Sequence, residues 1–433
     1  MFIIKRWEDL ADKEKYALHN RRLCHVESKE ITQTKKIIRQ VRKKGDKALR
    51  AYSKKFDHVD LYETPLRVQE KEFAEAELLL SAQVKNALHF CIDNALKVQN
   101  NDSDKAETQK ELRDGVTITS RSHPLKSVGL YVPHGKGSFP SMVYMQAVPA
   151  HIAGVPRIVM VTPPEKNGKI NPACLYAAKI SGVHEVYRIG GAHSIAALAY
   201  GTESIEPVTK ILGPGSPYVS IAKHLVSLNI ATGTITGPSE SMIIADGSTD
   251  PQLLAHDLLI EAEHGKDALA LLLCPDTLFL QKVKIFLEKL IQKAPEPFKT
   301  FFQSSLREEL TLIKVYDLQE AMKVAEQFAP EHLLLHGVHA EELAPYIKNA
   351  GEILCGIPFS IANYALGANS ILPTHGFSRS ASALSVRDFQ RTYAIIQATP
   401  QALQTAGTNA LYLADYEQFY HHALALRVRN FEK

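Results

Sequence analysis

The stretch EVYRIGGAHSIAALAY, residues 185–200, decides the fold class. It joins a short β-rich run over 185–189 to an apolar helical pattern over 195–200 through the glycine pair Gly190-Gly191. A strand, a tight turn and a helix in this order are the start of a βαβ unit, in which successive strands lie parallel. The stretch therefore predicts a parallel sheet covered by helices.

The same alternation continues through the middle of the chain. β-rich runs predict strands over 128–132, 157–161, 185–189, 242–245, 269–273 and 312–315. Amphipathic or apolar runs predict helices over 142–152, 172–180, 195–200, 218–226, 251–263, 278–292 and 318–327. We therefore expect an α/β protein with two Rossmann-like lobes, each built on a parallel sheet.

The length of 433 residues exceeds that of a single compact core and predicts several domains. Turn signals mark a lobe over 128–238, which we expect to be inserted into a larger α/β domain made of 25–127 and 239–384. Residues 1–24 predict a small helical segment. The tail, 385–433, carries two or three helical patterns and few strands that could form a core. We expect it to be helical and to dock on another surface.

Composition and charge exclude several classes of function. With 22% charged residues, 45% hydrophobic residues and a net charge of +3, the chain is an ordinary globular protein, too weakly basic to indicate nucleic acid binding. Five cysteines without a CxxC pair indicate a reducing compartment. No apolar run approaches the roughly 18 residues of a membrane span, and the first residues are too charged for a signal peptide. We expect a cytoplasmic protein.

Gly190-Gly191 is a candidate anion site. It lies between a predicted strand and a predicted helix, so free backbone N–H groups meet there, as they do at helix N-termini that bind phosphate. A tight turn without a ligand is the plainer interpretation of a single glycine pair. The dinucleotide fingerprint GxGxxG is absent from the predicted strand ends, so any dinucleotide site is an atypical one.

Two pairs of acidic and imidazole side chains carry candidate chemistry. Glu331-His332 precedes the apolar run 333–335, and reactive groups collect at strand ends in α/β proteins. Histidine titrates nearest neutrality, so His332 suits proton removal, and Glu331 could polarise a water or act as a second base. Glu261 and His264 share a helix face at i and i+3, a spacing by which one helix offers two metal ligands. Taken alone, each pair is also compatible with simple solvation.

Taken together, these segments closely resemble the histidinol dehydrogenase family over nearly the whole chain. The resemblance rests on GLYVP at 129–133, FPS at 139–141, GGA at 190–192, AALAYGTES at 196–204, GPG at 213–215, GPSE at 237–240, AEHG at 262–265, PEHL at 330–333 and LPT at 372–374. The order and spacing of so many blocks leave little room for chance. The resemblance implies an NAD-dependent, four-electron oxidation of L-histidinol through the aldehyde to L-histidine, in histidine biosynthesis.

The resemblance also implies roles for residues that match the family. His332 is then the general base for both hydride transfers, and Glu331 activates the water that attacks the aldehyde. Ser141 and Ser239 line the substrate pocket, and Tyr131 lines the NAD site. The family is a homodimer in which each C-terminal tail completes the partner's active site, which agrees with a tail unable to fold alone. A small-molecule substrate and a second copy are thus the expected partners, with no nucleic acid or membrane.

The metal positions depart from the family, which holds one zinc ion with Gln, His, Asp and a His from the partner's tail. The matching positions here are Glu261, His264, Asn363 and Tyr420, and a shift of one or two residues would place His421 or His422 at the fourth. The carboxylate at 261 could strengthen zinc binding, whereas the amide at 363 weakens it. We expect an altered zinc site with Glu261, His264, Asn363 and, after a one-residue shift, His421.

The substrate pocket departs from the family as well. The carboxylate that binds the substrate amine in the family falls at Phe359, and a family histidine near the substrate imidazole falls at Ser370. With Asn363, these two residues are expected to line the pocket. An ammonium beside a phenyl ring gains only a modest cation–π interaction, so selectivity for histidinol is weakened.

The expected cofactor site combines the Gly190-Gly191 turn with two replaced amide side chains. The expected Gln is His193 and the expected Asn is Ser216. Both can form hydrogen bonds, but fewer than an amide, so NAD should bind more weakly than in the family. A contact from Lys136 to the pyrophosphate would offset this loss.

Three interpretations remain open. The first is a histidinol dehydrogenase with an altered metal shell. The second is a paralogous NAD-dependent dehydrogenase of another small alcohol or aldehyde, with a weakened or absent zinc site. The third is a catalytically silent homologue that acts as a binding protein. The retained Glu331-His332 pair and the pocket serines argue against the third, and the altered metal, amine and NAD positions argue against the simplest form of the first.

Overall fold

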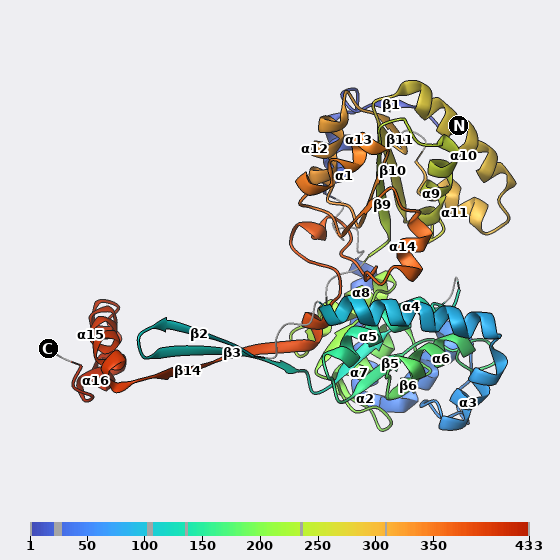
Figure 1. Ribbon diagram of the computed structural model, residues 1–433. Coiled ribbons are helices and arrows are strands. Elements are labelled where there is room, and N and C mark those ends of the chain that lie inside the picture. Colours follow the sequence, from blue (N-terminus) through green and yellow to red (C-terminus); the bar gives the residue numbers. More distant parts are fainter. Residues whose placement is uncertain are drawn as a thin grey trace. The chain divides into compact units, whose positions relative to one another are not determined.

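A computed structural model describes residues 2–20, 28–101, 107–134, 137–233, 237–307 and 310–431 (Figure 1). The described residues form three sheets. Two of them are parallel and lie in one compact unit, Met1–Asp102 with Leu125–Phe389. The third lies in a second unit, Ser103–Pro124 with Gln390–Lys433. The predicted α/β class with parallel sheets is confirmed.

The first parallel sheet has the strand order β6-β5-β4-β7-β8. Its strands are β4 (Val128–Tyr131), β5 (Ile158–Val161), β6 (Glu185–Tyr187), β7 (Lys210–Leu212) and β8 (Ala231–Thr232). Helices α5 (Pro140–Ile152) and α6 (Pro172–Ile180) cover one face, and α7 (Gly191–Tyr200) and α8 (Pro217–Val226) cover the other (Figure 1). Ile158 and Met160 pack toward α5 and α6, whereas Val159 and Val161 pack toward α7 and α8. Burial on both faces makes such strands continuously apolar, which is why the sequence reveals them.

The second parallel sheet has the strand order β1-β11-β10-β9-β12-β13. Its strands are β1 (Lys5–Arg6), β9 (Glu240–Ala245), β10 (Leu269–Cys274), β11 (Leu312–Lys314), β12 (His332–His336) and β13 (Glu352–Cys355). One face packs on α9 (Pro251–Ala262), α10 (Thr277–Lys293), α11 (Phe298–Ser305) and α14 (Phe359–Ala365). The other packs on α1 (Asp12–His19), α12 (Leu318–Phe328) and α13 (Val338–Glu341) (Figure 1). Short helical turns are η1 (Ser53–Asp57), η2 (Ala344–Tyr346), η3 (Phe377–Arg379) and η4 (Val386–Phe389).

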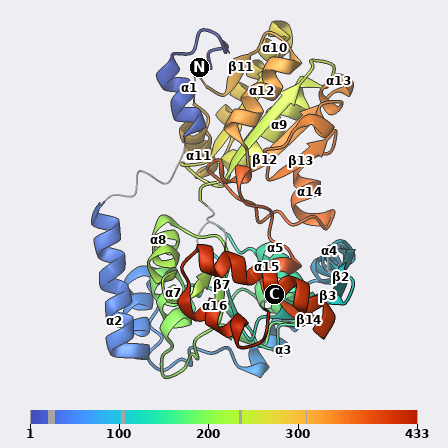
Figure 2. The same cartoon turned by 90° about the vertical axis from the view of Figure 1, so that its left-hand side faces the viewer.

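The N-terminal helices pack on a different sheet from the one predicted. We grouped 25–127 with 239–384, but α2 (Ser28–Tyr52) packs against α7 and α8 of the first parallel sheet (Figure 2). Likewise α3 (Glu70–Leu79) packs on α6, and α4 (Ala82–Asn101) on α5. The apolar stripe of α2 is visible in the sequence, but an apolar stripe does not indicate which surface will cover it. The segment 1–24 is not purely helical either, because β1 pairs with β11.

The third sheet is antiparallel and was not predicted. It has the order β14-β3-β2, from β2 (Glu107–Arg113), β3 (Val116–Pro124) and β14 (Gln390–Ala398), and the helices α15 (Pro400–Tyr416) and α16 (Tyr420–Arg427) follow it. The predicted all-helical tail is therefore wrong at β14. Every residue of β2 is exposed, so no alternation of apolar and polar residues marks it as a strand. The apolar cluster of α15 and α16 has only three buried residues, Leu411, Ala414 and Ala423.

No helix in the described part of the chain combines the length and apolar character needed to cross a membrane.

Candidate active site

Glu331 and His332 lie at the amino edge of the second parallel sheet. His332 is the first residue of β12 and pairs in register with Ser241 of β9 and Glu352 of β13. Because parallel strands start at one edge, the side chains that begin β9, β12 and β13 are brought together there. The site therefore combines groups separated by about a hundred residues in sequence.

Glu331 is almost fully buried beside the imidazole. Its Oε2 accepts the backbone N–H of Glu240 at 3.0 Å, and its Oε1 lies 3.7 Å from Nε2 of His332. Burial, helped by the negative charge of Glu261, raises the pKa of Glu331 well above its ordinary value, against the opposing effect of His332. A carboxylate with a raised pKa is a stronger base, so it suits proton removal from water.

His332 is held on three sides. Its Nδ1 lies 2.6 Å from Oε1 of Glu352, and its Nε2 lies 3.9 Å from Oε2 of Glu261. The ring of Phe359 packs edge-on against the imidazole, with centroids 4.7 Å apart. Burial alone lowers the pKa of His332, but Glu331, Glu352 and Glu261 outweigh it and raise the pKa to about 9.

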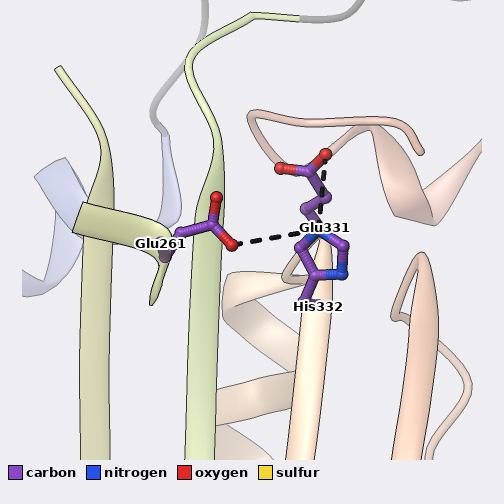
Figure 3. A group of neighbouring side chains, drawn as sticks. All are labelled: Glu261, Glu331 and His332. Atoms are coloured by element: carbon purple, nitrogen blue, oxygen red, sulfur yellow. Dashed lines mark ion pairs between the residues drawn. The ribbon is translucent and has the colours of Figure 1, made fainter. Parts of the chain in front are cut away.

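Glu261, in the last turn of α9, is a fully buried carboxylate aimed at this cluster (Figure 3). Neither of its oxygens accepts a hydrogen bond from any residue that the structure describes. Its Oε1 lies 3.8 Å from Nε2 of His264. Ligand atoms of Glu261, Glu331 and His332 all lie within 4.8 Å of one another. A buried carboxylate without hydrogen bonds is costly unless a cation pairs with it, so Glu261 fits a metal ligand.

A cavity of about 110 Å³ opens onto Glu331 and His332. It is lined by Phe139, Ser141, Met142, Met145, Pro214, Gly237, Ser239, His264, Glu331, His332, Asn363, Tyr364, Ser370, Ile371, Leu372 and Thr374. Seven of the predicted site residues thus meet around one space. The Oδ1 of Asn363 and the Oγ of Ser370 are buried and receive no hydrogen bond within the described part of the chain. Such atoms are available to a metal or a substrate.

One predicted site residue lies outside the cavity, and one lies in the second unit. We expected Phe359 to line the substrate pocket, but its side chain is fully buried, packs on the His332 ring and does not line the cavity. The reason is that it begins α14 on the covered face of the sheet, in the apolar cluster with α9. His421 is exposed on α16, in the second unit, where Tyr420 and His422 also lie.

The predicted cofactor residues collect at the carboxyl edge of the first parallel sheet. Strand order reverses between β4 and β7, and ligands of open α/β sheets bind at such a switch point. Tyr131 ends β4, and its hydroxyl accepts the N–H of Gly191 at 3.3 Å, where α7 begins after Gly190. His193 is buried, its ring centroid lies 5.7 Å from that of Tyr52 and 6.3 Å from that of Phe56, and neither ring nitrogen has a hydrogen-bond partner among the described residues. Ser216 caps α8 and is exposed.

The predicted contact from Lys136 lies outside the described residues. Glu352 was missed, although it makes the shortest contact to His332 in the described site. In the sequence it is only the polar start of the run EILC. Its importance follows from the parallel register of β12 and β13, which no local pattern reveals.

Comparison with known proteins gives one consistent result. A family model for histidinol dehydrogenase matches residues 21–430. The chain is 42% identical over 397 residues to histidinol dehydrogenase of Synechocystis sp., covering 91% of this chain and 92% of the relative. It is 39% identical to a histidinol dehydrogenase homolog of Rhizobium meliloti, covering 97% and 92%. A crystal structure of histidinol dehydrogenase from Elizabethkingia anophelis superposes with a TM-score of 0.90 at 30% identity, over 99% of this chain and 97% of that one. The chain therefore belongs to the histidinol dehydrogenase family, which consists of NAD-dependent oxidoreductases that use zinc.

Proposed function

We propose that this chain oxidises L-histidinol through the aldehyde to L-histidine and reduces two NAD molecules in doing so. The observation that carries the proposal is the cavity, which places Glu331 and His332 beside Ser141, Ser239 and His264. These residue types can bind a polar substrate, remove a proton from its hydroxyl and activate a water. Family membership supplies the reaction class.

The first step needs a base at the substrate hydroxyl. Nε2 of His332 faces the carboxylates of Glu331 and Glu261, and the residue lines the cavity. In our proposal Nε2 takes the hydroxyl proton as the carbinol carbon loses a hydride, which gives the aldehyde, NADH and one proton. NAD supplies the hydride acceptor, and its reactive carbon is the only electron sink that the step requires.

The second step needs water. Glu331 takes one proton from the water that adds to the aldehyde carbonyl, which yields the hydrate after the carbonyl oxygen is protonated. His332 then takes a hydroxyl proton from the hydrate while a second hydride leaves its carbon, giving the carboxylic acid. One alcohol, one water and two NAD thus become one acid, two NADH and two protons. The buried position of Glu331 favours this role, because burial makes its carboxylate more basic.

The metal would be held by Glu261, which pairs with His264, and by His264 and Asn363, which both line the cavity. The three side chains offer a carboxylate, an imidazole and an amide oxygen. The buried oxygens of Glu261 and Asn363 have no hydrogen-bond partner in the described chain. Carboxylate and imidazole are usual zinc ligands. A bound zinc ion would supply a Lewis acid that orients the substrate.

Product stoichiometry tests the proposal. Purified protein with L-histidinol and excess NAD should form two NADH per histidinol consumed, with histidine as the product. The His332→Asn variant serves as the background, since it keeps a polar side chain of similar size but cannot act as the base. Absence of NADH formation from histidinol, with or without added zinc, contradicts the proposal.

A second candidate is the oxidation of another small alcohol. Its supporting observation is that the position of the family's amine-binding carboxylate holds Phe359, which is buried away from the cavity. The remaining wall is largely apolar or hydroxylic, with Met142, Met145 and Leu372 among its members. A panel of small alcohols and aldehydes assayed beside histidinol separates the candidates. A higher kcat/KM for an alcohol without an amine favours the second.

A further inference from the structure

The carboxylate of Glu352 makes the shortest polar contact to the imidazole of His332. Oε1 of Glu352 lies 2.6 Å from Nδ1 of His332. The two residues start adjacent parallel strands in direct register, so the backbone of the sheet fixes their spacing. Both side chains are largely buried, His332 at 5% and Glu352 at 11% exposure, and this low exposure keeps the contact from exchanging freely with water.

This contact decides which ring nitrogen carries a proton. A carboxylate only accepts hydrogen bonds, so a 2.6 Å contact requires that Nδ1 carry the hydrogen. The neutral ring is then protonated at Nδ1 and has its lone pair on Nε2. Nε2 is the nitrogen that faces Glu331 and Glu261. The fixed tautomer thus presents the basic nitrogen to the reacting side of the ring.

The orientation of the ring is fixed by the same neighbourhood. Phe359 packs against the imidazole at an angle of 64° between ring planes, which hinders rotation about the Cβ–Cγ bond. A ring flip exchanges Nδ1 with Cδ2 and Nε2 with Cε1, so it would place a carbon beside Glu352 and break the 2.6 Å contact. The hydrogen bond to Glu352 and the packing of Phe359 therefore both oppose rotation of the imidazole about the Cβ–Cγ bond.

We propose that Glu352 is a positioning residue: its carboxylate holds the hydrogen on Nδ1 of His332 and thereby assigns proton transfer to Nε2. This inference rests on the proposed function in one respect, the role of His332 as base. Glu352 acts through His332 and does not line the cavity. Removing such an orienting carboxylate leaves the base present but in the wrong tautomer for part of the time.

The chain contains a matched control at the other end of β12. His336 is buried, and its Nε2 lies 3.3 Å from Oδ2 of Asp257, an ion-pair distance without the geometry of a hydrogen bond; the Asp257 side chain is 11% exposed, as that of Glu352 is. Neither residue lines the cavity at Glu331. Loss of a buried histidine–carboxylate pair by itself should therefore affect Asp257→Asn and Glu352→Gln alike, whereas an effect on proton transfer should appear only in Glu352→Gln.

The kinetic test compares Glu352→Gln, Glu352→Ala and Asp257→Asn, with zinc and NAD saturating. We expect kcat to fall about 10²-fold or more in both Glu352 variants, the scale of positioned acid–base catalysis, with KM for NAD unchanged. Formate added to Glu352→Ala should restore at least about a tenth of the lost rate, because it can occupy the space of the missing carboxylate. Asp257→Asn should keep the wild-type kcat. Equal losses in Asp257→Asn, or no loss at position 352, overturn the inference.

A spectroscopic test does not depend on activity. ¹⁵N correlation spectra of the histidine rings, with His332 identified by its absence in His332→Asn, report the tautomer directly. In spectra recorded at rising pH until the ring is neutral, the wild-type ring should be protonated at Nδ1, where Glu352 accepts its hydrogen bond, and the Glu352→Ala ring largely at Nε2. The same tautomer in both proteins overturns the inference. If the wild type oxidises no alcohol at all, the proposed function fails, while these spectra still decide the role of Glu352.

Discussion

Replacement of Glu261 by Gln should have opposite effects on the metal-free and the zinc-loaded protein. The side chain is fully buried, and its oxygens receive no hydrogen bond from the described residues. The change removes a negative charge and keeps nearly the same shape. We expect the metal-free variant to be more stable than the wild type and its affinity for zinc to be lower.

The expected magnitude follows from the neighbours of the carboxylate. At an effective dielectric constant of about 20, a charged His332 at 3.9 Å attracts Glu261 by about 4 kcal/mol. Glu331, within 4.8 Å, repels it by a similar amount when charged, so the two interactions largely cancel. The cost of burying the charge remains. We therefore expect Glu261→Gln to stabilise the metal-free protein by about 1–2 kcal/mol, or about 1–2 °C in the midpoint of unfolding.

Thermal unfolding with and without zinc measures both effects. Zinc should raise the midpoint of the wild type by more than that of Glu261→Gln, because a carboxylate ligand neutralises the ion and an amide does not. Glu263→Gln makes the same chemical change at an exposed neighbouring position and should behave as the wild type. A metal-free Glu261→Gln protein that is less stable than the wild type, or that gains as much from zinc, refutes the reasoning.

Further outcomes are expected. His332→Asn should lower kcat for NADH formation by about 10²–10⁴, and an unchanged rate would remove it from the role of base. Glu331→Gln should stall at the aldehyde and release one NADH per alcohol instead of two, which product analysis can check. In the metal-free protein Glu331, Glu352 and Glu261 raise the pKa of His332 to about 9, and a protonated ring cannot accept a proton. Because Glu331 and Glu352 remain beside the ring in the zinc-loaded enzyme, kcat/KM should still rise with pH above the usual range of histidine. A flat profile from about pH 6 to 9 contradicts this. The same shift stabilises the metal-free fold fully below about pH 6.5, and this contribution should be lost as the pH rises through about 9 in chemical denaturation. Light scattering should show a dimer, since α15 and α16 bury only a small apolar cluster of their own.

Sequence patterns predicted those parts of the fold in which burial is complete. The run IVMV of β5 is fully buried on both faces, so it is apolar without interruption and marks itself as a strand. The run ETQKELR of β2 is exposed throughout and has the composition of a solvated helix. It forms a strand because it pairs with β3, and its local sequence preference does not predict this. For the same reason the partner of α2 could not be derived from its apolar stripe.

The candidate site, like the fold, could be predicted from the sequence only in part. Glu331 and His332 are adjacent in sequence, and the motifs around them predicted a shared pocket with Ser141 and Ser239, which the cavity now contains. Their roles there remain predictions. The contact of Glu352 with His332 depends on strand register, and register is set by the packing of whole strands and not by the residues at their ends.

Phe359 and Glu352 together explain how the charges around His332 differ from the family's pattern. The family's carboxylate is absent at position 359, where an apolar ring packs on the imidazole, and another carboxylate at position 352 contacts the far nitrogen of that imidazole. Glu352 is therefore committed to His332 and does not line the cavity. Among the described residues that line it, Glu331 is the only carboxylate, and it adjoins the base. A substrate ammonium would have to compete with His332 for that charge, so the site is better suited to proton removal from an alcohol than to tight binding of an amine.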